Sequence, residues 1–174
     1  PEVKDLIKFL NTLGGKIEIV GRKILITGCK KIKKDIIHEV IFDRIELGTY
    51  MIAAALVGKK IIFNKINSKV IQNEINILKK MGVKLKIKKS TIEILKSNNI
   101  KKINLSTRPY PGFPTDLQAQ LMVLMTRAQG ISKIKESIFE NRFMHVPELK
   151  RMGANINIKN KTAAVKGPSK LTGA

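Results

Sequence analysis

The sequence has little of several residue types, and each shortage excludes a class of protein. It has no tryptophan and only two tyrosines among 174 residues, so few aromatic rings are available to stack on nucleic-acid bases. A single cysteine, Cys29, cannot form an internal disulfide, which favours a reducing cytoplasm. The sequence contains no apolar run of about 18 residues and no signal-peptide pattern, so we expect neither a membrane partner nor secretion.

The sequence also lacks the patterns of common metal and phosphate sites. His38 and His145 lie in different parts of the chain, and no cysteine or histidine pair has the spacing of metal ligands. The glycines in "TLGG" and "KMGV" are predicted to end helices, whereas phosphate-binding loops begin them. We therefore expect no metal site and no phosphate-binding loop of the Walker or Rossmann kind.

Acidic residues are scarce as well. The sequence has 13 acidic and 34 basic residues, giving a formal net charge of +21 and a pI near 10.2. Taken alone, such a charge indicates a nucleic-acid partner. However, the lysines are scattered through segments such as "KKIKKD", "ILKKMG" and "NNIKKI", and the abundance of Lys, Ile and Asn is typical of an AT-rich genome. We expect no specific nucleic acid, and a basic nucleic-acid-binding module remains the alternative from another class.

What the sequence does contain is an internal repeat. Hydrophobic residues make up 43% of the chain, enough for a sizeable core. Three glycines, Gly14, Gly82 and Gly153, each close an amphipathic helix and precede two alternating strands. The copies are "VKDLIKFLNTLGGKIEIVGRKILITG", "VIQNEINILKKMGVKLKIKKSTIEIL" and "FMHVPELKRMGANINIKNKTAAVKG". In the first copy, residues 16–20 are predicted to pair with residues 23–27.

A second pair of segments extends this repeat. "DRIELGTYMIAAALVGKKIIFNKI" and "TDLQAQLMVLMTRAQGISKIKESI" each combine an acidic helix start, an apolar helix, a glycine and a strand. The full unit is therefore a βαβαββ pattern, and the fold class is α/β. We expect the tail of one unit in residues 1–37, followed by two whole units. Helices that are apolar nearly all round should be buried between sheets, which predicts helices inside and sheets outside.

Several of these stretches resemble one enzyme family, in the same order along the chain. They are "LNTLGGKI", "DRIELGTYMIAAAL", "PYPGFPTDLQAQ", "IFENRFMHVPELKRMGA" and "GPSKLTGA". The chain resembles the UDP-N-acetylglucosamine enolpyruvyl transferase (1-carboxyvinyltransferase) family. This resemblance implies a two-domain inside-out α/β barrel built from six βαβαββ units. It implies that residues 1–40 are the last helix and hairpin of one domain. Residues 41–174 would be two of the three units of the other domain, after a crossover near residues 38–42.

The resemblance also implies a function. Such a transferase moves the enolpyruvyl group of phosphoenolpyruvate to the 3-hydroxyl of UDP-N-acetylglucosamine and releases phosphate. The chemistry that the resemblance implies needs no cofactor, since phosphoenolpyruvate is a cosubstrate. This is the first committed step of peptidoglycan synthesis, and it serves cell wall biogenesis, cell shape and cell division. A 3-phosphoshikimate 1-carboxyvinyltransferase shares the fold and the reaction and is the alternative. "FPTDLQAQ" and "FENRFMHVPEL" fit the sugar-nucleotide branch better.

By the same resemblance, the chain is expected to be part of a longer polypeptide. Family members are much longer, and their lysine and asparagine start and catalytic cysteine loop have no match here. Cys29 is interpreted as a structural or incidental residue, and the chain begins at Pro1 rather than at a methionine. We expect the 174 residues alone to be inactive and to need the remainder of the same polypeptide as a partner.

The stretch "RPYPGFPTD" leads into the first candidate site residue, Asp116. Its three prolines should stiffen the approach to the helix, and Gly112 should permit a close backbone approach. Thr115 is predicted to cap the helix, which places Asp116 in the first turn, where the helix dipole favours a carboxylate. Residue chemistry alone favours a capping role for Asp116. The resemblance implies instead that Asp116 contacts the 3-hydroxyl of the sugar and is the general base.

The resemblance implies three further substrate-binding residues in "SIFENRFMHVPEL". Ile138 matches a residue whose backbone contacts the sugar nucleotide, and Phe139 would form an apolar wall beside it. Arg142 matches an arginine near the site, where a guanidinium suits a carboxylate or phosphate. The structural alternative for Arg142 is a bridge to Glu140 or to a carbonyl.

Other polar residues in matching stretches are interpreted structurally. His145 is expected to be a helix-surface or packing residue. Asp43, Arg44 and Glu46 open the matching helix of the preceding unit, and we assign them to the helix start and the domain crossover.

Overall fold

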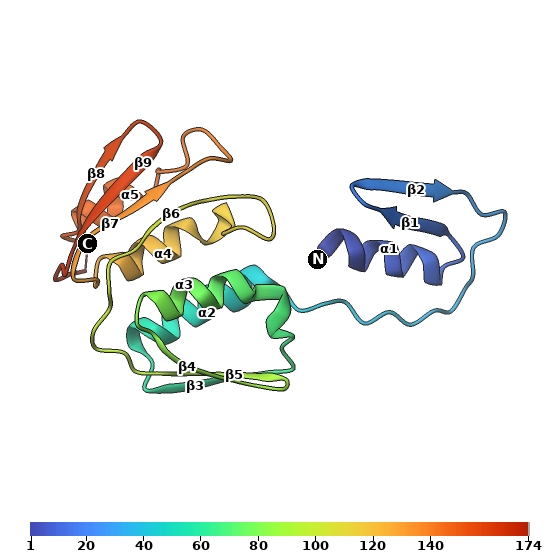
Figure 1. The fold of residues 1–174 in the computed structure, drawn as a ribbon, viewed down its shortest axis with the longest axis horizontal. Helices are drawn as coiled ribbons and strands as arrows, with labels where there is room; N and C mark the ends of the chain where they lie inside the picture. The colour runs from blue at the N-terminus through green and yellow to red at the C-terminus, as the bar shows by residue number, and fades with distance from the viewer. Residues whose placement is uncertain (174) are drawn as a thin grey trace. The chain divides into compact units, whose positions relative to one another are not determined.

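Residues 1–173 are described by the computed structural model, which divides the chain into two compact units, Pro1–Asp43 and Arg44–Ala174 (Figure 1). The first unit contains α1 (Glu2–Thr12), β1 (Lys16–Val20) and β2 (Lys23–Thr27). The second unit contains helices α2 (Arg44–Val57), α3 (Gln72–Lys80), α4 (Gln118–Met125) and α5 (Val146–Arg151), with 3-10 turns η1 (Ser68–Ile71) and η2 (Thr115–Leu117). Its strands are β3 (Lys60–Asn64), β4 (Lys84–Lys88), β5 (Thr91–Leu95), β6 (Asn104–Ser106), β7 (Gly130–Lys135), β8 (Asn155–Lys159) and β9 (Thr162–Gly167).

The first unit is one helix on one hairpin. β1 pairs antiparallel with β2, with Ile17 opposite Ile26, which confirms the pairing predicted for residues 16–20 and 23–27. Helix α1 contacts β1. The Asn11 side chain donates to the Ile17 carbonyl and accepts from the Ile17 N–H, both at 2.8 Å. This amide therefore fixes the turn between the helix and the hairpin.

The second unit has two sheets. Strands β3, β5 and β4 form an antiparallel sheet in that order. The other sheet has the order β6-β7-β9-β8, in which β6 and β7 are parallel and the remaining pairs are antiparallel. Residues 104–167 therefore form one complete βαβαββ unit, as predicted.

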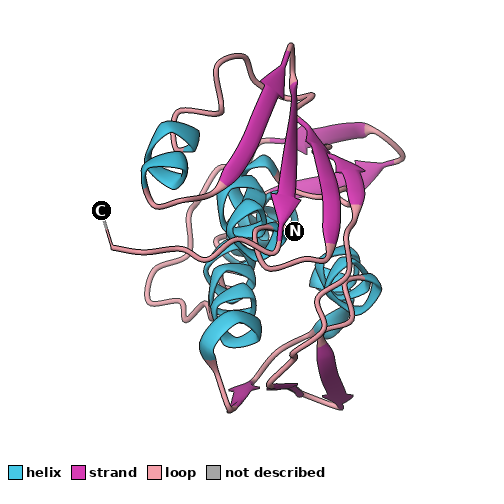
Figure 2. Cartoon of the chain, turned by 90° about the vertical axis from the view of Figure 1, so that its left-hand side faces the viewer, coloured by secondary structure: helices cyan, strands magenta, loops and turns pink. Residues whose placement is uncertain are grey.

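Helices α2 and α4 lie between these two sheets, as predicted, whereas α5 packs against β8 (Figures 1 and 2). Helix α2 contacts α4, β3 and β5, while α4 contacts β7 and β9. The largest side chains with no more than trace exposure are all apolar, which explains why the central helices show so little polar sequence. They are Met51, Ile71, Ile75, Met81, Ile92, Ile94, Leu117, Leu121, Met122, Leu124, Met125 and Ile134.

The threefold repeat around the glycines extends to individual hydrogen bonds. Gly14, Gly82 and Gly153 all have positive φ, at 113°, 81° and 100°, which confirms the predicted helix ends. Each glycine N–H donates to a carbonyl three residues earlier in its helix. After each hairpin the chain returns to the helix end, with N–H···O distances of 2.8, 2.8 and 2.9 Å to the residue before the glycine. A glycine suits each position because left-handed backbone costs it little.

One expected strand is not formed. The first of the two predicted whole units needs a strand ahead of α2, but no strand is assigned within residues 38–43. The chain there is held against the first unit, because His38 Nε2 lies 3.2 Å from Asp5 Oδ2 and the His38 ring packs edge-on against Phe9. The β3-β5-β4 sheet consequently has three strands, where the β6-β7-β9-β8 sheet has four.

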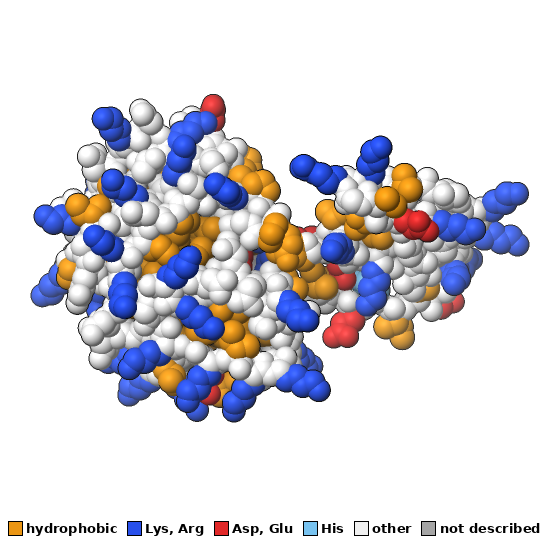
Figure 3. All heavy atoms as spheres, in the orientation of Figure 1, with side chains coloured by type: hydrophobic (Ala, Val, Ile, Leu, Met, Phe, Trp, Pro, Cys, Tyr) orange, Lys and Arg blue, Asp and Glu red, His pale blue; other side chains and the backbone are white. Residues whose placement is uncertain are grey.

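Basic side chains are spread over the visible surface of the second unit and do not gather in one stripe (Figure 3). This distribution agrees with the scattering of lysines along the sequence. Within the described part of the chain, no helix is long and apolar enough to cross a membrane.

The contact between α2 and the start of α4 depends on Gly48. A Cβ added at Gly48 would overlap Leu117 Cδ1 and lie 3.1 Å from Cδ2, and Leu117 is fully buried. Next to this contact, Gln120 donates to the Thr49 hydroxyl at 3.0 Å. Helix α2 therefore approaches α4 closely because it carries glycine at this position.

We predict that Gly48→Ala destabilises the protein although alanine is the better helix former. Overpacking a core costs about 1–3 kcal/mol, against a helix-propensity gain of about 1 kcal/mol. Urea unfolding should show a net loss for Gly48→Ala. The double variant with Leu117→Ala should be more stable than the sum of the two single changes predicts, since the clash is gone. Strict additivity of the two changes would contradict this packing.

Candidate functional site

The proline-rich stretch before α4 forms a closed loop. Arg108 N–H donates to the Phe113 carbonyl at 2.8 Å, and Gly112 N–H donates to the Pro109 carbonyl at 2.7 Å. A Cβ at Gly112 would overlap Arg108 Cβ and lie 2.9 Å from the Pro109 oxygen. The close backbone approach predicted for Gly112 is therefore confirmed, and the loop delivers the chain to η2 in one conformation.

Thr115 does not cap the helix, so that prediction was wrong. The residue at the cap position is Pro114, and no side chain caps η2. Thr115 is buried, and its hydroxyl donates instead to Glu136 Oε2 at 2.8 Å. The physical reason is that a buried carboxylate competes for this hydroxyl more strongly than a helix-end N–H does.

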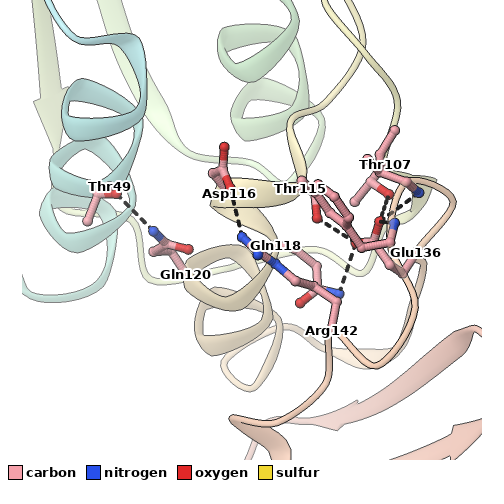
Figure 4. A network of polar contacts seen from close by, with 10 residues as sticks. Thr49, Thr107, Thr115, Asp116, Gln118, Gln120, Glu136 and Arg142 are labelled. Carbon is pink, nitrogen blue, oxygen red and sulfur yellow. Dashed lines mark hydrogen bonds and ion pairs between the residues drawn. The ribbon is translucent and has the colours of Figure 1, made fainter.

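Glu136 is the centre of the polar network beneath the site (Figure 4). Its side chain follows β7 and is only 1% exposed. It accepts five hydrogen bonds: from the hydroxyls of Thr107 and Thr115, the Gln118 amide, and the N–H groups of Ile138 and Phe139. Their donor–acceptor distances run from 2.8 to 3.3 Å. One carboxylate therefore ties together the end of β6, the start of α4 and the loop after β7.

These hydrogen bonds determine the charge state of Glu136. Burial alone would raise the pKa of the carboxyl, because it removes the charged form from water. The N–H of Ile138, the two threonine hydroxyls and the N–H of Phe139 outweigh burial and lower the pKa below its usual value. Glu136 is thus an ionised carboxylate held by neutral donors.

The loop after β7 is held to the end of β6 by further contacts. Ser137 N–H donates to the Thr107 hydroxyl at 2.9 Å, and the Ser137 hydroxyl donates to the Thr107 carbonyl. Ile138 N–H is taken by Glu136 Oε1 at 2.8 Å. No hydrogen bond to the Ile138 carbonyl is found within residues 1–173, so this oxygen can still accept one.

Asp116 and Arg142 join the two sequence motifs directly. Arg142 Nη2 lies 2.7 Å from Asp116 Oδ1, with side-chain exposures of 42% and 54%. The Arg142 guanidinium also lies over the Phe139 ring, 5.5 Å from its centroid. The structure therefore brings Asp116, Phe139 and Arg142 into one exposed cluster, with Ile138 next to Phe139.

Arg142 does not make the bridge to Glu140 that was its structural alternative. Glu140 is paired instead with Lys161, at 3.4 Å and largely in solvent. An exposed pair of this kind contributes little to stability.

A hollow of about 500 Å³ opens beside this cluster. Phe139 and Arg142 line it, whereas Asp116 and Ile138 do not. The remaining lining residues come from the loop after β7 and from the β8–β9 hairpin: Glu136, Glu140, Asn141, Phe143, Met144, Ile158, Asn160 and Lys161. Apolar, acidic and basic side chains thus share one open cavity.

The histidines lie apart from this network. His145 is at the start of α5, and burial, aided by the nearby positive charge of Arg142, lowers its pKa. Its Nε2 is buried without a hydrogen-bond partner among the described residues, which fits a packing role. His38 pairs with Asp5 in the first unit. Cys29 is exposed.

The residues that open helix α2 also have defined contacts. Helix α2 begins at Arg44, one residue after Asp43, which confirms that this stretch opens the helix. Arg44 lies over the Tyr110 ring at 5.5 Å and 3.9 Å from Glu74. No group of three potential metal-ligating side chains is found within residues 1–173.

Sequence reasoning missed Glu136 and its partner Thr107. The signal was present in the alternation of "SKIKE", where Ser132, Ile134 and Glu136 are the buried positions. A glutamate at an inward position of a strand needs buried donors. Thr107, at the end of β6, and Thr115, at the start of η2, are buried and supply such donors.

Comparison with known proteins matches the whole chain. A family model described as EPSP synthase (3-phosphoshikimate 1-carboxyvinyltransferase) covers residues 1–174. A relative named UDP-N-acetylglucosamine 1-carboxyvinyltransferase, from Pelagibacter ubique, is 50% identical over 100% of this chain and 42% of its own length. A relative of the same name from Halothermothrix orenii is 47% identical with the same coverage. The chain thus spans about 42% of the length of the curated relatives it matches.

Solved structures share the fold at lower identity. The crystal structure of the enolpyruvyl transferase NikO from Streptomyces tendae matches with a TM-score of 0.86 and 24% identity, over 97% of this chain and 41% of that one. EPSP synthase from Acinetobacter baumannii matches with a TM-score of 0.70 and 22% identity, over 94% and 40%. These likenesses confirm the predicted α/β fold class.

We predict that Glu136→Gln destabilises the protein at neutral pH. A glutamine keeps the shape but turns an NH₂ group toward some of the donors. Each buried donor left without an acceptor lowers the free energy of unfolding by about 1–3 kcal/mol. The folded-state pKa of Glu136 is lowered, so its stabilisation is complete above the unfolded-state pKa and is lost as pH falls through the folded-state value. Urea unfolding from pH 7 to pH 3 should therefore show the gap between the parent and Glu136→Gln shrinking in acid. A gap that is constant or widens would contradict this.

Proposed function

Since the chain belongs to the EPSP synthase (3-phosphoshikimate 1-carboxyvinyltransferase) family, we propose that it is part of an enzyme that transfers the enolpyruvyl group of phosphoenolpyruvate to the 3-hydroxyl of UDP-N-acetylglucosamine. The observation that carries this proposal is the ion pair between Asp116 and Arg142. It joins the two long motifs on which the family resemblance rests. We further propose that residues 1–40 end one domain of that enzyme and that residues 41–174 supply two of the three units of the other.

Asp116 is the proposed general base. Arg142 occupies only Oδ1, and Oδ2 has no hydrogen-bond partner among the residues described, so it is free to accept the proton of the 3-hydroxyl. The oxygen then bonds to C2 of phosphoenolpyruvate as the C2–C3 double bond opens and C3 takes up a proton. Loss of a proton from C3 re-forms the double bond and breaks the bond from C2 to the phosphate oxygen, so that phosphate leaves. A carboxylate whose supporting turn is rigid holds this oxygen in a reactive geometry at low entropic cost.

Phe139, Ile138 and Arg142 are the proposed substrate-binding residues beside it. Because the Ile138 N–H is already engaged by Glu136, a backbone contact to the sugar nucleotide would use the Ile138 carbonyl. Phe139 lies about half exposed next to it and offers an apolar wall. Arg142 supplies a fork of donors suited to a carboxylate or phosphate oxygen.

The sugar nucleotide is favoured over 3-phosphoshikimate as the acceptor. Curated relatives at 44–50% identity carry the name UDP-N-acetylglucosamine 1-carboxyvinyltransferase. The EPSP synthase structure matches at 22% identity, a likeness that supports the fold alone. We propose that the enzyme acts at the first committed step of peptidoglycan synthesis, in the cytoplasm, with consequences for cell shape and division. The reaction as proposed needs no metal or cofactor.

A chimaeric enzyme tests this function. Residues 1–174 would replace the matching segment of the Pelagibacter ubique relative, which supplies the rest of a full-length chain. We expect phosphate release from phosphoenolpyruvate that depends on UDP-N-acetylglucosamine and is not supported by 3-phosphoshikimate. A folded chimaera that uses 3-phosphoshikimate, or neither acceptor, would refute the proposal.

We predict that Asp116→Asn in this chimaera lowers kcat by about 10²- to 10⁴-fold. Asparagine keeps the size and can still accept a hydrogen bond from Arg142, but it cannot take the proton. Binding of UDP-N-acetylglucosamine, measured by calorimetry, should weaken far less than kcat falls. A kcat within about threefold of the parent, well below the contribution of a general base, would remove Asp116 from the chemistry.

We also predict that the 174-residue chain alone releases no phosphate. A site shared with the rest of the polypeptide cannot be completed by one wall, and the chain spans about 42% of its relatives. The measurement is the same phosphate assay, with the chimaera as positive control. Turnover by the isolated chain at a rate comparable to that of the chimaera would contradict the division of the site proposed here.

A further inference from the structure

We propose that Glu136 is a positioning residue for this reaction: its buried carboxylate holds the turn that carries Asp116 and the backbone of Ile138 and Phe139 in one geometry. The inference rests on the proposed function. It assigns a role in substrate binding and turnover to a side chain that is buried and touches no substrate.

The first support is the position of the donors around Glu136. One oxygen, Oε2, accepts from Thr115 and Gln118, which flank Asp116 at the start of α4. The other oxygen, Oε1, accepts from the N–H groups of Ile138 and Phe139. The carboxylate thus connects the proposed base on one side with the proposed binding loop on the other, across 18–21 positions of sequence.

The second support is that the start of α4 and the loop after β7 have few other direct side-chain contacts with each other, because Ser137 ties the loop to Thr107 at the end of β6 and not to α4. The direct link between the two motifs is the Asp116–Arg142 pair, which is about half exposed on both sides. Exposed ion pairs hold their side chains weakly. The Glu136 bonds are buried and charge-assisted, which makes them roughly twice as strong as neutral ones. Glu136 therefore fixes the relative position of Asp116 and the loop, and the surface pair adjusts to it.

The third support is that the buried side chain at position 136 is a carboxylate and not an apolar group. A buried carboxylate is costly, and an apolar core residue would stabilise the packing as well. However, an apolar residue could not hold the N–H groups of Ile138 and Phe139 inward. Turning these N–H groups toward Glu136 directs the Ile138 carbonyl away from it. A glutamate at this position is explained by the loop conformation it imposes.

The test uses the chimaera and two substitutions of Glu136. Glu136→Gln keeps the length and removes the charge, whereas Glu136→Asp keeps the charge and shortens the side chain. We expect Glu136→Gln to raise KM for UDP-N-acetylglucosamine and to lower kcat, each by about 10- to 100-fold, since small displacements of reacting groups have effects of that size. Glu136→Asp should recover part of the loss.

Two control variants separate positioning from stability and from surface charge. Ile94→Ala removes a fully buried side chain of β5, in the other sheet, and lowers stability without touching the network. Glu148→Gln neutralises an exposed glutamate of α5 that pairs with Arg151. All variants are assayed at a temperature where circular dichroism shows each to be folded. Both controls should keep KM and kcat within about threefold of the parent, far from the range expected for misplaced groups.

The outcomes distinguish the inference from the function on which it rests. If the unsubstituted chimaera is folded but inactive, the proposed function fails and the inference falls with it. If the chimaera is active and folded Glu136→Gln retains parental KM and kcat, the inference alone is overturned. It is also overturned if Ile94→Ala reproduces the kinetic losses at equal loss of thermal stability, because Glu136 would then be merely structural.

Discussion

The structure around the site depends on one constraint: a carboxylate buried at Glu136 must be surrounded by donors. Burial without hydrogen bonds would cost several kcal/mol, so the chain places two threonine hydroxyls, an amide and two backbone N–H groups around it. Those donors belong to three segments of the chain, two of which lie 18–29 positions before Glu136. Satisfying one charge therefore fixes the end of β6, the start of α4 and the loop after β7 relative to one another, and the exposed pair of Asp116 and Arg142 rests on this arrangement.

Much of the fold could be predicted because local chemistry and global packing agree. Gly14, Gly82 and Gly153 end their helices in left-handed backbone, and alternating strands follow each of them. The apolar helices lie between sheets, as their lack of a polar face requires. The strand expected ahead of α2 is not formed, and no local sequence pattern indicates its absence. His38 instead pairs with Asp5 and packs on Phe9 within the first unit, and these long-range contacts have no local sequence signal.

The candidate site could be predicted in part. Asp116, Phe139 and Arg142 were found through motifs, and the structure brings them together. Thr115 was misassigned as a cap because cap preference is a local rule, whereas its real partner, Glu136, lies 21 positions away. The bond between Arg142 and Asp116 was also missed, since a pair of exposed side chains 26 positions apart leaves no periodic trace in sequence.

Amide hydrogen exchange at Ile138 and Phe139 tests the central constraint most directly. Both N–H groups lie in a loop, outside any helix or strand, and donate to Glu136. In the chimaera at neutral pH, they should exchange far more slowly than the neighbouring loop amides that have no acceptor. Glu136→Gln should abolish that protection while leaving exchange in α4 near the parental rate. Equal protection of Ile138 and Phe139 in the parent and in folded Glu136→Gln would contradict the role given to the buried carboxylate.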